Sequence, residues 1–244
     1  MPSLVAGLRI AAILLLFALI ALPHLLLTVI GLRHWIPPHF LGGVGRLAGL
    51  RVHVEGRPVR GTTLLVANHV SWLDILALGG AARAAFVAKG NLQANALLGW
   101  LCRQNDTLFV DRERRGAVGQ QVGQLGRLLA KRRMCIFPEG TTGPGTALLP
   151  FKSALLSAVE GAGEVTVQPV ALAYADAPAI AWTDAEDGAA NVRRVLGRIA
   201  PIHLTIRFLP PLSGAEMAGR KAMAAAAQAR IAGALALPIR AANA

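Results

Sequence analysis

The chain has 244 residues, which is enough for one sizeable hydrophobic core and favours a single domain over two. Hydrophobic residues make up 54% of it and the mean hydropathy is +0.50, too apolar for an ordinary water-soluble domain. The formal net charge of +12 suits an anionic membrane surface. Nucleic acid is not expected as a partner, because the basic residues are scattered, aromatic residues are 5% and no nucleic-acid-binding module is recognisable.

The first apolar segment, residues 10–32, contains no Asp, Glu, Lys or Arg. At about 1.5 Å per residue, a helix of that length can cross a hydrocarbon core of about 30 Å. Pro23 and His24 interrupt the segment, and proline lacks the amide hydrogen that continues a helix. We therefore favour two shorter helices in one leaflet over a single span. A secretory signal peptide is the alternative, because Arg9 precedes the apolar stretch, but no small-x-small cleavage site follows.

We divide the chain into an N-terminal membrane anchor, residues 1–45, and one domain, residues 46–244. Basic residues flank the apolar segment at Arg9, Arg33, Arg46 and Arg51. Cys102 and Cys135 lie in apolar surroundings without metal-ligand spacing, which predicts buried thiols in a reducing compartment and no metal site. The expected location is the cytoplasmic face of the inner (plasma) membrane, in contact with membrane lipids.

After the anchor, short runs rich in β-branched residues alternate with helical patterns. This alternation predicts an α/β fold, a single domain with a mostly parallel, roughly seven-stranded sheet flanked by helices. The expected strands are residues 51–55, 63–67, 85–88, 107–110, 134–137, 166–173 and 203–209.

Two other segments have a local pattern. Apolar residues recur at helical spacing at Val118, Val122, Leu125 and Leu129. We interpret the basic residues that follow, at the helix C-terminus, as structural or membrane-facing: Lys131, Arg132 and Arg133. Residues 213–216 (Ser-Gly-Ala-Glu) form a capping box that predicts an Ala-rich helix through about Ala236. Residues 176–200 have no clear pattern, and we expect a loop over the functional site.

A histidine and an aspartate follow the second expected strand. The carboxyl edge of a sheet is where α/β proteins usually build sites, so His69 is expected there. Imidazole can take a proton from a hydroxyl and return it to a leaving group, provided that a partner fixes its tautomer. If the chain turns after His69 and enters a helix, Asp74 in the first turn can reach back to the imidazole. Residues 71–74 fit a simple capping box equally well, so the spacing allows a dyad without proving it.

The segment Asn68-His69-Val70-Ser71-Trp72-Leu73-Asp74 resembles the histidine-four-residues-aspartate motif of the glycerolipid acyltransferases, the family that includes 1-acylglycerol-3-phosphate acyltransferase. The motif alone recurs by chance, but four further family blocks are matched in order. They are residues 86–89 (Phe-Val-Ala-Lys), 109–112 (Phe-Val-Asp-Arg), 137–142 (Phe-Pro-Glu-Gly-Thr-Thr) and 167–170 (Val-Gln-Pro-Val). The resemblance covers about residues 50–210.

This resemblance implies an O-acyltransferase in which His69 is the general base and Asp74 orients it. Both act on the free hydroxyl of a lysolipid, and the expected acceptor is 1-acyl-sn-glycerol-3-phosphate (lysophosphatidic acid), which gives phosphatidic acid in phospholipid biosynthesis. A fatty-acyl thioester is already activated, so the enzyme needs alignment, a base and donors that face the oxyanion. No metal or organic cofactor is expected, and acyl-CoA or an acyl carrier protein thioester is the co-substrate.

The resemblance also implies a set of substrate-binding residues: Lys89, Asp111, Arg112, Glu139, Gly140, Thr141, Thr142 and Lys152. Lys89 and Arg112 are cations at strand ends and suit a lipid phosphate, although lone basic residues are usually just solvated. The loop that begins at Glu139 is glycine-rich, so its backbone can approach a ligand or form an ordinary turn. Glu139 would bond an acceptor hydroxyl or hold this loop.

The chain departs from the family at Thr142, where the third block usually ends in arginine. Either other cations replace that arginine, or the acceptor head group is not a phosphomonoester. Lyso-ornithine lipid is the alternative acceptor, because members of the family acylate a hydroxyl on its acyl chain. Two other classes are a membrane-bound thioesterase or lipid hydrolase, for which the Gly-x-Ser-x-Gly elbow is missing, and a non-catalytic lipid-binding protein, against which the intact motif residues argue.

Overall fold

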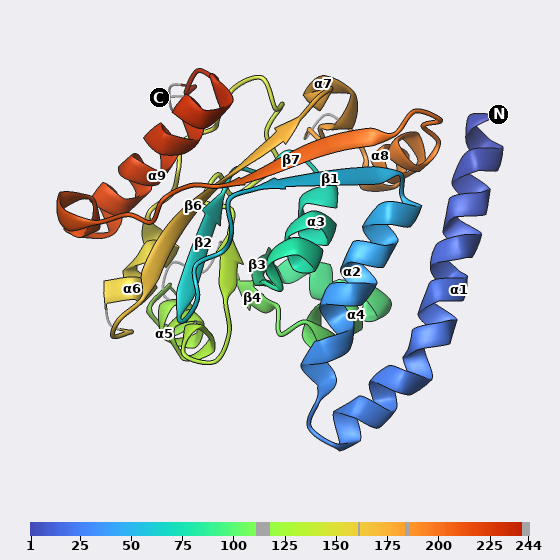
Figure 1. Cartoon of the computed structure of the whole chain (residues 1–244), viewed down its shortest axis with the longest axis horizontal. Helices are drawn as coiled ribbons and strands as arrows, with labels where there is room; N and C mark the ends of the chain where they lie inside the picture. Colours follow the sequence, from blue (N-terminus) through green and yellow to red (C-terminus); the bar gives the residue numbers. More distant parts are fainter. Residues whose placement is uncertain (111–117, 161, 184–185, 241–244) are drawn as a thin grey trace.

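The computed structural model describes residues 1–110, 118–160, 162–183 and 186–240. One sheet with the strand order β1-β7-β6-β2-β5-β3-β4 forms the centre of the molecule (Figure 1). The expected α/β fold is confirmed, and each strand lies within one residue of its predicted bounds. The strands are β1 (Leu50–Glu55), β2 (Thr63–Ala67), β3 (Ala85–Lys89), β4 (Leu108–Val110), β5 (Met134–Ile136), β6 (Thr166–Tyr174) and β7 (Ile202–Phe208).

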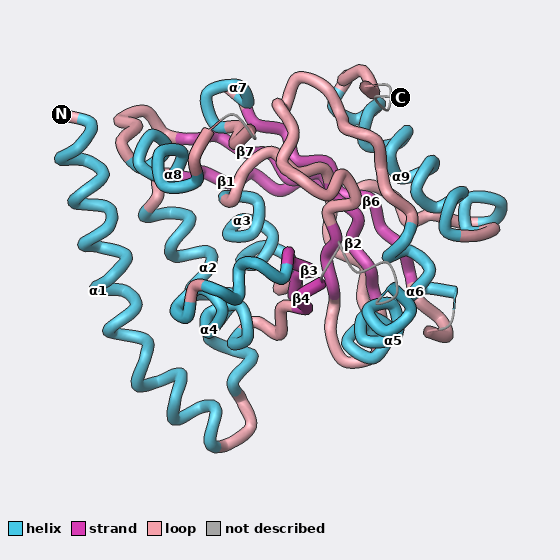
Figure 2. Tube along the Cα trace, turned by 180° about the vertical axis from the view of Figure 1, so that it is seen from behind, coloured by secondary structure: helices cyan, strands magenta, loops and turns pink. Residues whose placement is uncertain are grey.

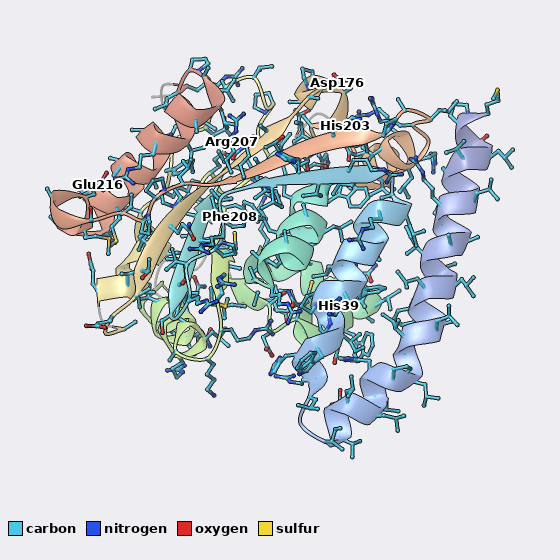
Figure 3. The ribbon with its side chains drawn as sticks, viewed as in Figure 1. His39, Asp176, His203, Arg207, Phe208 and Glu216 are labelled. Atoms are coloured by element: carbon cyan, nitrogen blue, oxygen red, sulfur yellow. The ribbon has the colours of Figure 1, made fainter. Side chains whose placement is uncertain are left out.

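The sheet is mostly parallel, as predicted. Strands β6, β2, β5, β3 and β4 all run in one direction, whereas β7 pairs antiparallel with β6 and β1 pairs parallel with β7. Arg207 of β7, labelled in Figure 3, forms an ion pair with Glu55 of the neighbouring strand β1 at 2.8 Å. The carboxyl ends of β2, β5, β3 and β4 therefore meet at one edge of the sheet.

Helices cover both faces of the sheet (Figure 1). They are α1 (Pro2–Val29), α2 (Ile36–Leu47), α3 (Leu73–Ala82), α4 (Ala96–Gln104), α5 (Val118–Leu129), α6 (Ser157–Glu160), α7 (Ala177–Ile180), α8 (Gly188–Leu196) and α9 (Arg220–Leu235). Short 3₁₀ turns connect some of them: η1 (Arg33–Trp35), η2 (Gly90–Ala94), η4 (Ala154–Leu156) and η5 (Gly214–Met217). Helices α1, α2, α3 and α8 supply one hydrophobic core, and α5, α6 and α9 supply the other. Strand β2 is fully buried because its alternate side chains enter the two cores.

The N-terminal segment is one continuous helix, so the expected break at Pro23 is wrong. Proline costs about 3 kcal/mol inside a helix, but tertiary contacts hold α1 on both sides of Pro23. Phe17 packs against Phe40 and Trp100, and His24 contacts Gln104 at 3.0 Å. Figures 1 and 2 show α1 bending towards its C-terminal end.

Helix α1 is long and apolar enough to cross a membrane, as judged by length and composition. However, it lies alongside the domain, from Arg9, which donates to the Leu196 carbonyl at 3.1 Å, to His24 beside α4 (Figure 2). These contacts extend over about 22 Å of helix. Helix α1 is therefore held along the domain rather than projecting from it. Its outward face is apolar and exposed: Leu4, Leu8, Leu14, Leu15, Leu19, Leu22, Leu25 and Leu26.

Two other expectations need correction. Residues 176–200 contain helices α7 and α8, because Asp187 caps α8 by accepting from the amides of Ala189 and Ala190. The capping box of Ser213 and Glu216 is present, but it opens η5, and α9 begins only after Gly219, whose φ of 148° breaks the helix.

Helices α2 and α3 pack with their backbones in contact, which predicts a sensitive position. A Cβ added at Gly80 would lie 2.9 Å from the Gly42 Cα. We expect Gly80→Ala to lower the free energy of unfolding by about 1–3 kcal/mol in urea denaturation. The control is Gly233→Ala in α9, where a Cβ meets no described atom within 4 Å. This variant should gain about 0.5–1 kcal/mol, and equal effects of the two changes would refute the close packing.

Candidate active site

The predicted site residues follow β2 and β5, which are adjacent and parallel. Val66 of β2 is paired with Ile136 of β5, so both strands end at the same level of the sheet. His69 follows the end of β2, and Glu139 follows the end of β5. The sheet thus brings together two residues that are 70 positions apart in the sequence.

His69 and Asp74 form the expected pair. The imidazole Nδ1 lies 2.8 Å from Asp74 Oδ2, and Asp74 stands in the first turn of α3. The Asp74 side chain is fully buried, whereas 18% of the His69 side chain remains exposed. A proton on Nδ1 that is donated to Asp74 leaves the lone pair of Nε2 available to accept a proton from a ligand.

The Asp74 carboxylate has three further donors. Oδ2 accepts from the amides of Val70 at 2.7 Å and Ser71 at 3.0 Å, and Oδ1 accepts from the Tyr174 hydroxyl at 2.6 Å. Asp74 thus contacts His69 and also accepts from the turn before α3. The expected capping box is incomplete, because the Asp74 amide donates to the Ser71 carbonyl at 3.0 Å rather than to the Ser71 side chain. Burial, the negative charge of Asp74 and the hydrogen bond to it raise the pKa of Tyr174 well above its ordinary value. The phenol thus stays a donor.

Aromatic rings fix the plane of the imidazole. The rings of His69 and Phe137 are stacked at 4.1 Å between centroids, with an interplanar angle of 18°. Phe137 is in turn parallel to Phe86, with centroids 6.2 Å apart. Phe137 lies directly after β5 and Phe86 within β3, so the sheet supports the ring that supports His69.

Glu139 holds the loop that follows β5. Its Oε1 accepts from the His69 amide at 2.7 Å and its Oε2 from the Leu149 amide at 3.0 Å, and the Gly143 amide donates to the His69 carbonyl at 2.7 Å. Glu139 is 4% exposed. Burial raises its pKa to about 7, against the opposing effect of the two amide donors, and the charge of Asp74 adds to the rise. This geometry matches the loop-holding role, and a contact with substrate stays a prediction.

Thr142 ties the loop to a neighbouring segment. Its hydroxyl donates to the Trp182 carbonyl, and the Trp182 amide donates to the Val70 carbonyl at 3.0 Å. Residues 176–200 therefore lie beside the site, as expected, although they are not a loop. Gly140 and Thr141 lie half-buried between Glu139 and this contact, and the φ of Gly140 is 83°.

The expected cations lie farther from His69. Lys89 ends β3, two strands away from β2 or about 10 Å, and it is exposed. Lys152 is also exposed, and its amide donates to the Pro138 carbonyl at 2.9 Å. Asp111 and Arg112 lie outside the described residues. Among the described candidates, the structure gathers His69, Asp74, Glu139 and Thr142 and leaves the two lysines on the rim.

Three contributors to the site were not predicted from the sequence: Tyr174, Phe137 and Trp182. Phe137 lies in a family block, and its ring character next to a strand end was the available signal. Tyr174 is the only tyrosine of the chain and ends β6, the strand beside β2. The position of this tyrosine at the end of a buried strand was therefore the signal that its hydroxyl contacts the site.

The raised pKa of Glu139 predicts a pH-dependent stability. A carboxyl whose pKa rises on folding, from 4.5 to about 7, adds stability that is complete below pH 4.5 and is lost as the pH rises through about 7. Relative to Glu139→Gln, the wild type should lose about 3 kcal/mol of unfolding free energy between these values. Urea denaturation at several pH values measures this difference. The exposed Glu164→Gln is the control for removal of a carboxylate, and a pH-independent difference for Glu139→Gln would contradict the raised pKa.

Comparisons with known proteins identify the family of the chain. The model of the Acyltransferase family matches residues 50–173. The lyso-ornithine lipid O-acyltransferase of Brucella abortus is 33% identical over 219 residues, which is 82% of each chain. The enzyme of the same name from Rhizobium meliloti is 42% identical over 150 residues, 58% of this chain and 51% of that protein. This chain is thus aligned with about half of one relative and four fifths of the other.

Two relatives of another name are also similar. The 1-acyl-sn-glycerol-3-phosphate acyltransferase of Neisseria gonorrhoeae is 35% identical over 143 residues, 55% of this chain and 54% of that protein. The crystal structure of the 1-acyl-sn-glycerophosphate acyltransferase from Thermotoga maritima covers 100% of both chains, with a TM-score of 0.69 and 21% identity, and shows the same fold. The resemblance read from the motifs is thus confirmed, and the chain belongs to the glycerolipid acyltransferase family as an O-acyltransferase.

Proposed function

We propose that this enzyme transfers a fatty-acyl group from an acyl thioester to the hydroxyl of lyso-ornithine lipid. The observation that carries the choice of acceptor is Thr142, which stands where the family usually has an arginine. Its hydroxyl is turned to the Trp182 carbonyl, so this position supplies no cation for a phosphate. Four relatives bear the name lyso-ornithine lipid O-acyltransferase and support the same acceptor. They come from Rhizobium, Brucella, Rhodobacter and Pseudomonas.

The proposed chemistry uses His69 as a base. Nε2 takes the proton of the acceptor hydroxyl while the oxygen attacks the thioester carbonyl. The tetrahedral intermediate then expels the thiolate, which takes the proton back from the imidazolium and leaves as a thiol. Asp74 holds the imidazole by Nδ1 and stabilises its positive charge during the transfer. The sum is ester plus thiol from alcohol plus thioester, and the proposal includes no metal or organic cofactor.

The ornithine head group suits the few cationic side chains described near the site. A phosphomonoester carries close to two negative charges, whereas ornithine offers one carboxylate together with an amine. The described cations near the site, Lys89 and Lys152, are exposed and stand as single charges rather than as a fork that could clamp a phosphate. A singly charged carboxylate therefore needs fewer cations near the site than a phosphomonoester does.

Lysophosphatidic acid, the acceptor favoured by the sequence, remains the second candidate. The Neisseria relative bears the name of an enzyme for 1-acyl-sn-glycerol-3-phosphate, as does the Thermotoga structure. The catalytic steps would be the same with either lipid, because both present a hydroxyl. The donor, acyl-CoA or acyl carrier protein, is likewise a proposal, as is the location of the enzyme on the cytoplasmic face of the membrane through α1.

The acceptor can be tested with two lipids and one labelled acyl donor. We expect the purified enzyme to acylate lyso-ornithine lipid in detergent micelles and to leave lysophosphatidic acid almost unreacted, with His69→Ala as the blank. Thr142→Arg should raise the ratio of phosphatidic acid to acylated ornithine lipid about tenfold, because it adds a charged hydrogen bond to phosphate.

Thr142→Val is the matched control, since it removes the bond to Trp182 without adding a charge. Turnover of lysophosphatidic acid alone by the wild type would replace the proposal with the second candidate. Release of free fatty acid without acylation of either lipid would point to a hydrolase.

The dyad can be tested separately with Asp74→Asn. The amide oxygen can keep the acceptor role of Oδ2, and the NH₂ group can donate to the Tyr174 oxygen, so folding should survive. Without the carboxylate, however, the imidazolium loses its counter-charge, and kcat should fall about 10³-fold or more. Tyr174→Phe is the milder control and should cost no more than about tenfold. Near-normal turnover of Asp74→Asn, at an unchanged melting temperature, would refute the role of Asp74.

A further inference from the structure

A second charged site lies at the edge of the sheet opposite to His69. It is a cleft of about 560 Å³ where β2, β3 and β5 begin, between the turn that joins α1 to α2 and the end of α5. Figure 1 shows that turn at the bottom of the molecule. Five cationic side chains line the cleft: Arg33, Arg83, Lys131, Arg132 and Arg133.

One carboxylate, Asp106, is found among the described residues that line the cleft, and it is already engaged. Its Oδ1 accepts from Arg33 at 2.6 Å and its Oδ2 from Arg132 at 2.6 Å, with His34 Nδ1 3.3 Å from Oδ2. A single carboxylate cannot balance five cations, so the cleft keeps a positive charge. Burial lowers the pKa of His34, and the charge of Arg132 lowers it further, which agrees with such a field.

Three of the cations have no carboxylate partner within the described part of the chain: Arg83, Lys131 and Arg133, of which Arg133 donates to the carbonyls of Ala82 and Val59. Lys131 is exposed. Arg83 is the residue that ends α3, with a φ of 52°, and its guanidinium lies 6.0 Å from the ring centroid of Trp35. Trp35 is 57% exposed. The cleft thus presents unpaired cations beside an exposed indole.

The position of the cleft beside the apolar surface of α1 indicates which anion it binds. The exposed apolar surface of α1 continues through Val29, Ile30 and Leu32, and Arg33 follows at once. Cations next to an apolar segment, with a tryptophan beside them, are typical of the level of lipid head groups. A site for a freely dissolved anion would have no need of the apolar surface at its rim.

We propose that this cleft binds the phosphate of an anionic phospholipid in the leaflet on which α1 lies. Arg33, Arg83 and Lys131 would contact the phosphate, while Asp106 and Arg132 hold Arg33 in position. The lipid bound here is not a substrate, because the cleft and His69 lie at opposite edges of the sheet. Occupation of the cleft fixes the turn after α1 to the membrane surface.

Vesicle binding of the full-length chain tests this site. We expect Arg83→Gln with Lys131→Gln to bind vesicles of phosphatidylcholine and phosphatidylglycerol roughly 10- to 30-fold more weakly than the wild type, with little change on phosphatidylcholine alone. The matched control is Arg220→Gln with Lys221→Gln in α9, which removes the same charge on the side of the molecule away from α1 (Figure 1). The control should lose less than about threefold, because charges farther than about 8–10 Å are screened.

Equal losses in the two double variants would show that binding depends on net charge alone and would overturn the site. The melting temperature of each variant verifies folding, and Lys131→Gln alone provides the test if Arg83 is required for the fold. To separate the two sources of phosphate, short-chain phosphatidylglycerol and inorganic phosphate are compared as stabilisers in thermal melts. Stabilisation by the lipid that is lost in the Arg83/Lys131 variant supports the proposal. Equal stabilisation by inorganic phosphate would assign the cleft to a free anion instead.

Discussion

The buried carboxylate of Asp74 is the interaction on which the rest of the active edge depends. An ionised carboxylate that leaves water costs several kcal/mol unless donors replace its hydration. Here two backbone amides, an imidazole and a phenol point at its two oxygens. The amides belong to the turn between β2 and α3, and the phenol ends β6. The charge can be buried only when β2, α3 and β6 are all in place, so one constraint fixes the start of a helix, the exit from a strand and the direction of an imidazole.

Glu139 is a second buried carboxylate at the same edge of the sheet, and its surroundings differ from those of Asp74. Glu139 has two backbone amides as donors and no cation among its described contacts, so burial raises its pKa to about 7. Asp74 is in contact with an imidazole, which can take up a proton and become its counter-charge. In the proposed mechanism Asp74 therefore stabilises the positive charge that His69 gains, whereas Glu139 holds the backbone of His69 and the loop that follows β5. Repulsion between the two acids adds to the difference, since Asp74 raises the pKa of Glu139.

The sequence predicted best those features that depend on local pattern. Strand bounds came within one residue because buried strands leave short apolar runs. The pairing of His69 with Asp74 could be predicted because they are only five positions apart and one turn joins them. Tyr174, by contrast, meets Asp74 across 100 positions, and only the order of β6 beside β2 brings it there. Local pattern also misjudged Pro23, where contacts of α1 with the domain outweigh the missing hydrogen bond. The two helices within 176–200 were missed because the short α8 relies on the cap at Asp187.

The strands of the sheet have the His69 site at one end and the basic cleft at the other. In our proposals both of them meet the membrane on which α1 lies. A five-residue strand is about 17 Å long, so the catalytic edge and the basic edge are a fixed distance apart. Helix α1 is held along its length, from the Arg9 contact with α8 to the His24 contact with α4, and so it cannot turn relative to the sheet. With α1 in one leaflet, as proposed, its depth there sets the depth at which His69 meets a lipid. A hydroxyl on an acyl chain and a hydroxyl on glycerol differ in their place along the lipid, so we expect selection of the acceptor to depend on this depth as well as on the uncharged side chain at position 142.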